Sequence, residues 1–480
     1  MKRILVILIL FLSYVSIGQI NFYKTYTGSA FDEGQGVTQL PDSSYAITGS
    51  SAAFSELSGQ AYLMLVDSLG NHLWTKSYGG NGSDWGRRVF HKPGVGFVIA
   101  GYTSTTVDGS FNYYIIQTDE SGVLVSEKNF GTSNWERLWD AVMLPNEGLM
   151  LVGETEGESS ELKDMYIVRT DDQGDTLWTR TISTQYDDVA YAAEMINDTT
   201  VVIGGDSWEN DEPRSTIISM HIDGSINWQK YYGDIVETGI RDLKYYNNNL
   251  YAGGYIVQII KDDWDLWALK TDMNGNFVED LTDDLEGTDF LSSIAVKSAS
   301  DFYIAIVSDS PDLGVFPEGT DVFITKFNIN FDYNGFSKSF SGVNSDITNQ
   351  MINTIDNGIV FTGTCSDDRV QPSMGSDIMI VKIGPNDEAI TTADSGNDLV
   401  SIIELNNKEG FKIFPNPAAE KLFLPETLKG VTYSIYNNLG KEVQAGEIDS
   451  FIDVSRFKSG IYHIKVLQEN KYSTVRFIKK

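Results

Sequence analysis

Residues 73–122 hold a phrase that recurs along most of the chain. It reads LWTKSYGG at 73–80, GFVIAGYTS at 96–104 and YYIIQTDESG at 113–122, with an acidic loop and a variable loop between these parts. Apolar alternation and short apolar runs that end in Gly or Asp are typical of short β-strands joined by turns. Because long helical periodicities are also absent, the sequence predicts an all-β protein.

Two markers show that this phrase repeats about every 52 residues. An Asp-x-x-Gly turn begins at Asp67, Asp119, Asp171 and Asp272, with a shortened copy at Asp223 and degenerate copies near Asn328 and Gly384. A Gly that ends an apolar strand keeps step with it, with Ser308 in the sixth copy, at Gly49, Gly101, Gly153, Gly205, Gly254 and Gly363. A period near 50 with four strand-like segments per copy predicts the blades of a propeller.

We expect four strands in each copy, the first being the innermost. In the first copy they are 37–40, 45–49, 62–67 and 74–78. This register leaves a lone fourth strand at 22–26 and a lone third strand at 378–383. Pairing these two covers two open sheet edges and closes a seven-bladed β-propeller over residues 19–386. The sixth copy is degenerate, which leaves six or eight blades as alternatives.

The Asp-x-x-Gly sequence has the chemistry of a type I turn, in which the carboxylate caps nearby amides and Gly tolerates the exit geometry. A calcium loop is the alternative, because Asp272, Asn274 and Asn276 alternate. The Gly stands at the wrong place for an EF-hand and no terminal Glu follows, so the turn is favoured. We expect no cofactor, and a bound cation such as calcium has no support from the pattern.

The predicted connectors between blades carry acids, with aromatic residues beside several of them. The acids four residues after the Tyr-Gly position or its equivalent are Asp32, Asp84, Asp187, Glu237 and Asp346, with Glu136 and Asp289 as displaced relatives and Trp85 and Trp135 among the aromatics. Such a rim at the channel mouth could bind a cation, or hydrogen-bond sugar hydroxyls beside stacking aromatics. The favoured alternative is structural: each acid caps its own connector and each aromatic wedges between blades. The loops after the marker Gly differ in every copy, as binding loops on a fixed scaffold do.

The sequence contains no catalytic motif that we can name. The four histidines, His72, His91, His221 and His463, lack metal-site spacing, and there is no GxSxG or phosphate loop. Carboxylates from distant loops could still form a glycosidase-like pair. Cys365 is the only cysteine, which excludes an internal disulfide.

Charge separates the chain into two parts. The net charge is −32, which argues against nucleic acid as a partner, since phosphate binding needs a basic surface. Residues 411–480 carry 11 Lys/Arg against 7 Asp/Glu, which leaves 24 against 60 for the other 410 residues. An acidic body followed by a basic tail indicates two modules.

Residues 1–18 are predicted to be a signal peptide. Lys2 and Arg3 precede an apolar run at 4–15, and small residues at Ser16 and Gly18 suit cleavage before Gln19. No other stretch is apolar enough to cross a membrane, so we expect no transmembrane segment after removal of the leader.

The last part of the chain is a polar linker, 387–410, and a compact module, 411–480, that is predicted to be a small Ig-like β-sandwich. The module resembles the C-terminal sorting domain of the type IX secretion system of Bacteroidetes. The matching pieces are FPNPA at 414–418, YSIYNNLGK at 433–441, IDVS at 452–455, SGIYHIKV at 459–466 and FIKK at 477–480. Within them the sorting motif falls on Pro415, Asn416, Pro417, Gly440, Lys441, Gly460, Tyr462 and Lys479.

This resemblance implies a route out of the cell. In that family the leader delivers the chain to the periplasm, and the tail docks on the outer-membrane machinery and is usually cleaved, here within the linker. The cargo is then released or attached to surface lipopolysaccharide. The blade phrase is also similar to the W-x-K-x-Y-G-G repeats of propellers that are common among such cargo proteins.

The sequence therefore favours an exported propeller that acts as a binding or adhesion module at the cell surface or in the medium. Its expected ligand is a glycan or a neighbouring surface protein. The alternatives are an enzyme acting on extracellular polysaccharide or peptide, and a structural surface component.

Overall fold

The structure is a computed structural model that describes most of the chain from Ile20 to Lys480. The predicted signal peptide lies outside the described residues. The other gaps are 29–30, 55–58, 107–109, 133, 157–161, 234–236, 258–262, 284–285, 311–318, 341–344, 367–374, 399–412, 414–417, 426–427, 438–441, 450, 459 and 469–470. No described helix is long and apolar enough to cross a membrane.

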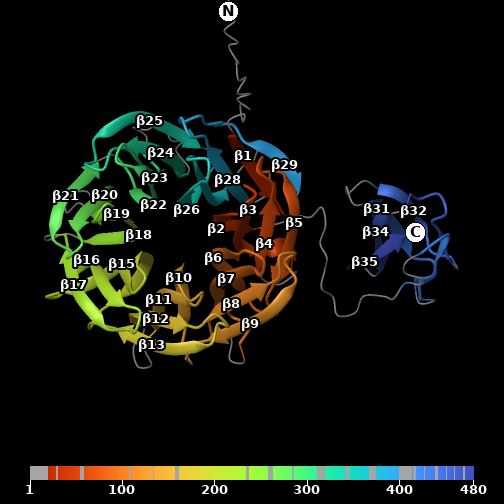
Figure 1. Cartoon of the computed structure of the whole chain (residues 1–480), viewed down its shortest axis with the longest axis horizontal. Helices are drawn as coiled ribbons and strands as arrows, with labels where there is room; N and C mark the ends of the chain where they lie inside the picture. The colour runs from red at the N-terminus through yellow and green to blue at the C-terminus, as the bar shows by residue number, and fades with distance from the viewer. Residues whose placement is uncertain are drawn as a thin grey trace, which may run out of the picture.

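Seven sheets surround a central channel, and each follows the four-strand order expected from the repeats (Figure 1). Blade 1 contains β2 (Asp32–Gln39), β3 (Tyr45–Ser51), β4 (Gln60–Val66) and β5 (His72–Tyr78), with a short 3-10 turn, η1 (Ala52–Phe54). Blade 2 contains β6 (Asp84–Lys92), β7 (Gly96–Thr103), β8 (Asn112–Thr118) and β9 (Leu124–Phe130). Blade 3 contains β10 (Glu136–Met143), β11 (Leu149–Glu156), β12 (Lys163–Thr170) and β13 (Thr176–Ile182).

The second half of the ring repeats this order. Blade 4 contains β14 (Val189–Asn197), β15 (Thr200–Glu209), β16 (Glu212–His221) and β17 (Ile226–Tyr232). Blade 5 contains β18 (Thr238–Tyr246), β19 (Asn249–Val257), β20 (Trp264–Asp272) and β21 (Phe277–Asp283). Blade 6 contains β22 (Asp289–Ser298), β23 (Asp301–Ser308), β24 (Asp321–Phe327) and β25 (Tyr333–Phe340). Blade 7 contains β26 (Ile347–Asn353), β27 (Ile359–Cys365), β28 (Asp377–Ile383) and, from the other end of the chain, β1 (Phe22–Thr27).

The predicted closure of the ring is confirmed. β1 pairs antiparallel with β28, so that Tyr23 lies opposite Val381 and the first strand completes the last blade. Two sheet edges that would otherwise stay open are thereby paired. The fold is a seven-bladed propeller, and the degenerate sixth copy still forms a full four-stranded blade.

One strand was not expected. β29 (Asp394–Asp398) pairs parallel with the outer side of β1, in the segment predicted to be a linker. The side chain of Lys24 on β1 donates to the carboxylate of Asp394. The sequence DSGND gives no strand signal because an added edge strand is held by backbone hydrogen bonds and needs no apolar side chains. The linker prediction was therefore wrong at residues 394–398.

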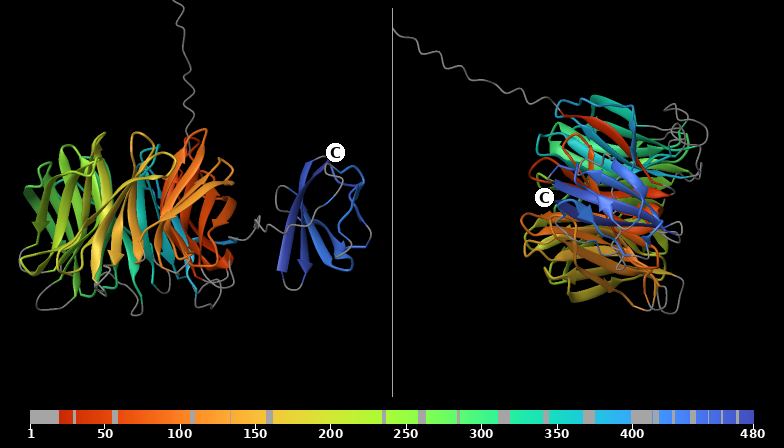
Figure 2. Two further views of the ribbon diagram at one scale, coloured as in Figure 1. Left: turned by 90° about the horizontal axis from the view of Figure 1, so that it is seen from below. Right: turned by 90° about the vertical axis from the view of Figure 1, so that its right-hand side faces the viewer.

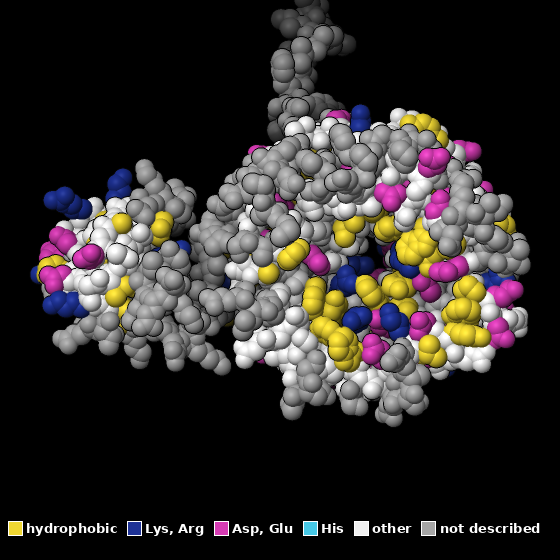
Figure 3. Space-filling view, turned by 180° about the vertical axis from the view of Figure 1, so that it is seen from behind, with side chains coloured by type: hydrophobic (Ala, Val, Ile, Leu, Met, Phe, Trp, Pro, Cys, Tyr) yellow, Lys and Arg dark blue, Asp and Glu magenta, His cyan; other side chains and the backbone are white. Residues whose placement is uncertain are grey.

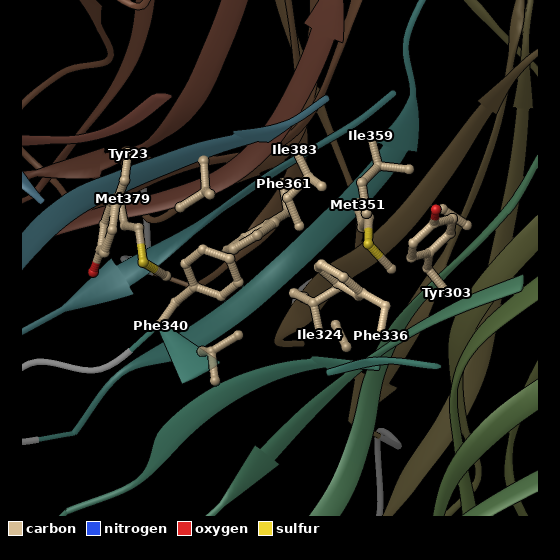
Figure 4. Close-up of a cluster of buried hydrophobic side chains, with 14 of the residues drawn as sticks. Tyr23, Tyr303, Ile324, Phe336, Phe340, Met351, Ile359, Phe361, Met379 and Ile383 are labelled. Atoms are coloured by element: carbon tan, nitrogen blue, oxygen red, sulfur yellow. The ribbon is translucent and has the colours of Figure 1, made fainter. Parts of the chain in front are cut away.

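The core consists of apolar clusters between neighbouring sheets. Figure 4 shows the cluster in which side chains of blades 6 and 7 interdigitate. The ring of Phe340 lies edge-on to Phe361 at 5.2 Å and to Tyr23 at 5.9 Å. Burial of each such side chain stabilises the fold by about 1.5–3 kcal/mol. Because Tyr23 belongs to the first strand, this cluster also holds the ring closed.

The Asp-x-x-Gly segments are turns, as predicted. The Asp272 carboxylate accepts the backbone N–H groups of Asn274 and Asn276 at 2.8 Å, and Gly275 has φ of 72°. The same geometry recurs at Asp67, whose carboxylate caps the amide of Asn71, with Gly70 at φ of 74°. The alternation at 272–276 thus serves to close a hairpin.

The marker Gly has a steric cause. A Cβ at Gly101 would lie 1.7 Å from the carbonyl oxygen of Trp85 on the neighbouring inner strand. The other marker glycines meet a carbonyl at 1.8–2.1 Å in the same way. In blade 6 the pairing register places Ile306 at this position, opposite Leu291. The assignment of Ser308 as the sixth marker was therefore wrong by two residues.

The C-terminal module forms its own small β-sandwich, as expected. A four-stranded sheet has the order β32 (Glu442–Glu447), β31 (Thr432–Asn437), β34 (Gly460–Gln468), β35 (Lys471–Lys479), and a two-stranded sheet joins β30 (Lys421–Leu422) to β33 (Ile452–Asp453). Ile435, Ile464 and Phe477 are fully buried in its core.

Three of the predicted sorting-motif residues are placed by the structure. Tyr462 stacks on Phe477 at 5.6 Å and donates its hydroxyl to the carbonyl of Lys458 at 2.9 Å. Gly460 begins β34, and Lys479 is buried at the end of β35. The remaining motif residues lie outside the described residues and are Pro415, Asn416, Pro417, Gly440 and Lys441.

Candidate ligand-binding face

Four antiparallel strands per blade bring the start of the first strand and the end of the second to the same side of the propeller. We call this side the connector face. Figure 2 shows the propeller from the side, and Figure 3 views the connector face. On it, hydrophobic and basic side chains gather around the opening of the central channel, with acidic side chains among them.

A repeated hydrogen-bonded unit opens the inner strands. In blade 2 the carboxylate of Asp84 accepts the hydroxyl of Thr103 on the second strand and the backbone N–H of Gly80 at 3.0 Å. In blade 3 Glu136 accepts from Thr155 at 2.9 Å and from the Thr132 backbone at 3.1 Å. The same unit joins Asp32 to Ser51 and Asp188 to Ser207. We call the acid position of this unit the tie position.

The tie position corrects two residues of the predicted acidic rim. Asp188, not Asp187, is buried and bonded in blade 4, while Asp187 is exposed and accepts the backbone N–H of Lys163 at 2.8 Å. In blade 5 the tie position is Thr238, while Glu237 is exposed and accepts the hydroxyl of Tyr255 at 3.0 Å.

The remaining blades also fill the tie position. Glu136 and Asp289, predicted as displaced relatives, stand in register, and Asp289 pairs directly with Ser308. Asp346 accepts the backbone N–H of Ser366 at 3.2 Å, and buried Cys365 stands where other blades have a hydroxyl.

Burial dominates the electrostatics of the tie. Asp32, Asp84 and Asp346 have no exposed surface, and burial raises the pKa of Asp32 to about 6 despite its hydrogen bonds to Ser51 and Gly28. Burial likewise raises the pKa of Asp289 to about 6. Carboxylates enclosed in this way offer no atom to a ligand, and their geometry matches the capping alternative.

Three residues after the tie, every inner strand contains a β-bulge. The pairing register of each first strand with its second strand shifts at this point. A bulge re-aims one side chain out of the sheet's alternation. The re-aimed residues, which we call the bulge ring, are Gln35, Arg87, Trp139, Tyr191, Arg241, Ser292 and Asn349.

Side chains of the bulge ring touch one another from blade to blade. Arg87 donates to the amide oxygen of Gln35 at 2.6 Å, and its guanidinium lies over the ring of Trp139 at 4.3 Å. Trp139 contacts Tyr191 at 5.2 Å between centroids, and Arg241 lies over Tyr191 at 4.0 Å. Contacts between five successive inner strands place these side chains in the channel. They line it with cations and aromatic faces.

An aromatic cluster adjoins the ring in blades 2 and 3. Trp85 stacks on Tyr102 at 4.9 Å and 19°, and Phe111 lies edge-on to both and to Trp135. We call these four residues the aromatic platform. Trp135 is 43% exposed, so the platform presents an indole to solvent. Trp85 and Trp135, which the sequence places beside acids, both belong to this platform.

Two of the arginines on this face have carboxylate partners. Arg241 pairs with Asp206 at 2.9 Å, which raises the pKa of Arg241 against the effect of its burial. Arg137 lies over Phe111 and Trp135, and its guanidinium is 3.6 Å from the carboxylate of Glu154. These pairs hold aromatic and basic groups in fixed positions.

Other candidate sites are weaker. Among the described residues no group of three His, Cys, Asp or Glu side chains could hold a metal ion. A groove of about 490 Å³ is lined by Gly80 and Thr103 beside the tie of blade 2 and by residues of outer strands that include Glu127 and Lys128. No bulge-ring residue lines it, and its described lining mixes polar and apolar groups.

Comparison with known proteins identifies the C-terminal module. Residues 412–480 match the family described as secretion system C-terminal sorting domain. The sorting domain directs the protein to the cell surface or the extracellular space and implies interaction with the type IX secretion machinery. Among curated proteins, none matches the chain.

Solved structures with similar architecture share little sequence with this chain. Puromycin hydrolase is 12% identical to this chain, with a TM-score of 0.44. The match covers 72% of this chain and 53% of that enzyme, so this chain spans about half of the enzyme's length. Sqt1 from Chaetomium thermophilum is 14% identical with a TM-score of 0.43, covering 72% of this chain and 83% of its own. Drosophila Semaphorin 2a is 8% identical with a TM-score of 0.43, covering 96% and 97%.

Proposed function

We propose that the exported propeller is a glycan-binding module and that it binds its ligand on the connector face, at the aromatic platform and the adjoining bulge ring. One observation carries this proposal. Trp85, Trp135 and their neighbours form a partly exposed aromatic surface held beside arginines at the mouth of the channel. Stacking faces with a few oriented polar groups are what a saccharide ring requires of a binding site.

Variation between blades supports the same assignment. The tie position is filled by an acid in six blades, whereas the bulge ring has Gln, Arg, Trp, Tyr, Arg, Ser and Asn in turn. Repeated residues serve the scaffold that all blades share. Residues that differ from blade to blade, on a face shared by all, suit one asymmetric ligand.

The test is a glycan array probed with the full chain and with a Trp135→Ala variant. We expect saturable binding to a defined saccharide and at least tenfold weaker binding by the variant, because a central aromatic contact is often worth about 2 kcal/mol or more. Phe277→Ala is the matched control, since Phe277 is 59% exposed on an outer strand of blade 5. Equal affinity of the Trp135→Ala and Phe277→Ala variants would remove the platform from the site.

A further inference from the structure

Arg87 differs from the other arginines of the connector face. Its Nη1 donates to the amide oxygen of Gln35 at 2.6 Å and its Nε to the carbonyl of Leu138 at 3.3 Å. Both acceptors are neutral. Among the described residues no carboxylate lies within ion-pair distance of its guanidinium, although the chain carries 67 acidic residues.

Neighbouring arginines form ion pairs with carboxylates. Arg88, the next residue, bonds Asp140 at 2.6 Å, and Arg241, in the same bulge ring, bonds Asp206. The acids closest to Arg87 have other partners. Glu33 accepts from the side chain of Gln35 at 3.1 Å, and Glu154 is enclosed by Arg137, Lys163 and the indole N–H of Trp139.

The guanidinium of Arg87 is desolvated by its surroundings and has no ion-pair partner among the described residues. Burial lowers the pKa of the guanidinium, although the nearby Tyr102, Glu33 and Glu154 act to raise it. The faces of Trp139 and Tyr102 lie 4.3 and 5.7 Å from it, so the group is held rigidly between two aromatic rings. An anion that entered the channel mouth would meet a preorganised fork of N–H donors.

We propose that Arg87 is an anion subsite and that the ligand of this face is an acidic saccharide, whose carboxylate or sulfate pairs with Arg87 while a sugar ring stacks on the platform. Tyr102 connects the two parts, since it stacks on Trp85 and lies beneath the guanidinium. This inference rests on the proposed glycan-binding function. It specifies that the ligand is negatively charged and that Arg87 binds the charged group.

The experiment compares three probes that differ in charge: an oligogalacturonate, its methyl ester, and a sulfated galactan oligosaccharide. Calorimetric titration of the full chain should give at least tenfold tighter binding of one or both acidic probes than of the ester, and the preference should weaken with added salt. Arg87→Gln should abolish the preference and keep the affinity for the ester. Arg87→Lys should keep part of the preference that Arg87→Gln loses, because lysine supplies the positive charge without the parallel N–H donors of a guanidinium.

Arg180→Gln is the matched control, because Arg180 is exposed on outer strand β13 and, among the described residues, donates to the carbonyl of Gly224 alone. It should bind all probes like the unmodified chain, and thermal unfolding should show that each variant is folded. Equal binding of ester and acidic probes, or a preference that survives Arg87→Gln, would overturn the anion subsite and leave glycan binding intact. Failure of every charged and neutral saccharide to bind would overturn the proposed function itself.

Discussion

Two positions on each inner strand, three residues apart, differ in how much the residue type varies from blade to blade. The tie position is an acid in six of seven blades and is buried against a hydroxyl or an amide of its own blade. The bulge ring changes its side chain at almost every blade and faces the channel. Asp84 and Arg87 show the contrast within one strand. Repetition in this fold therefore marks the residues that hold a blade together, and variation marks the positions that we propose for ligand binding.

The largest effect on stability is expected at the tie position. Asp84→Ala removes the acceptor of the buried Thr103 hydroxyl and of the half-buried Gly80 amide. Each unsatisfied buried group costs about 1–3 kcal/mol, so the free energy of unfolding should fall by about 3 kcal/mol. Urea unfolding followed by tryptophan fluorescence measures it. Asp187→Ala, which removes an exposed acid of the connector between blades 3 and 4, should change stability by less than about 0.5 kcal/mol. Similar losses in both variants would contradict the tie.

The buried acids also predict a dependence of stability on pH. The pKa of Asp32 is about 6 in the folded chain, above its ordinary value of 3.8, so between these values the folded state binds a proton that the unfolded chain has lost. Stability from this group is therefore complete below about pH 4 and is lost as the pH rises through 6. From pH 4.5 to 7.5 the loss is about 2 kcal/mol.

Many groups titrate in this range, so the test is a difference between variants. Urea unfolding at pH 4.5 and pH 7.5 measures how much the free energy of unfolding changes between the two values. This change should be smaller in Asp32→Asn than in the unmodified chain, by the contribution of about 2 kcal/mol that Asp32 makes. The Asp42→Asn variant is the control, because Asp42 is exposed and its pKa is lowered by Ser44. An unchanged pH dependence in Asp32→Asn would show that the carboxylate is not desolvated.

Loss of one aromatic face from the bulge ring should have a moderate effect on stability. Tyr191→Ala removes a face that Arg241 and Trp139 both contact, and a cation–π contact is worth about 0.5–2 kcal/mol. The free energy of unfolding should fall by about 1 kcal/mol, while Tyr191→Phe, which keeps the face, should be close to neutral. Equal losses for Ala and Phe would mean that the hydroxyl, not the stacked face, carries the interaction.

The smallest effect is expected at the strand that the sequence did not reveal. Asp394→Ala breaks the ion pair of β29 with Lys24, but Asp394 is 67% exposed at its side chain, and exposed pairs contribute about 0–1 kcal/mol. Stability should change by less than about 0.5 kcal/mol, because backbone hydrogen bonds hold the strand. A large loss in urea unfolding would show that this ion pair, rather than the backbone, anchors β29.

Much of the fold was predictable because its signals are local. The Asp turns and the marker Gly depend on short-range sterics, as the 1.7 Å approach of a Cβ at Gly101 to Trp85 shows, and they fix the strand register directly. The closure of the ring followed from counting strands. The polar strand β29 was missed because edge pairing leaves no apolar pattern.

The site was predictable only in part. Trp85 and Trp135 were found because they neighbour the acids, but the acids themselves were assigned one residue early at Asp187 and Glu237. The connector before Asp187 lacks the Tyr-Gly reference, whereas Tyr232-Gly233 precedes Glu237 although the tie position there is Thr238. Arg87 was missed altogether. A bulge interrupts the two-residue alternation without any change in residue type, so sequence alone does not show which side chain turns into the channel.

The most direct test measures stability and saccharide affinity on the same preparations of Asp84→Ala and Trp135→Ala. We predict that Asp84→Ala lowers the free energy of unfolding and leaves the affinity of the folded fraction unchanged. We predict that Trp135→Ala does the reverse. Loss of affinity in Asp84→Ala without loss of stability would contradict the account, since it would place the repeated acid in the binding site and not in the scaffold.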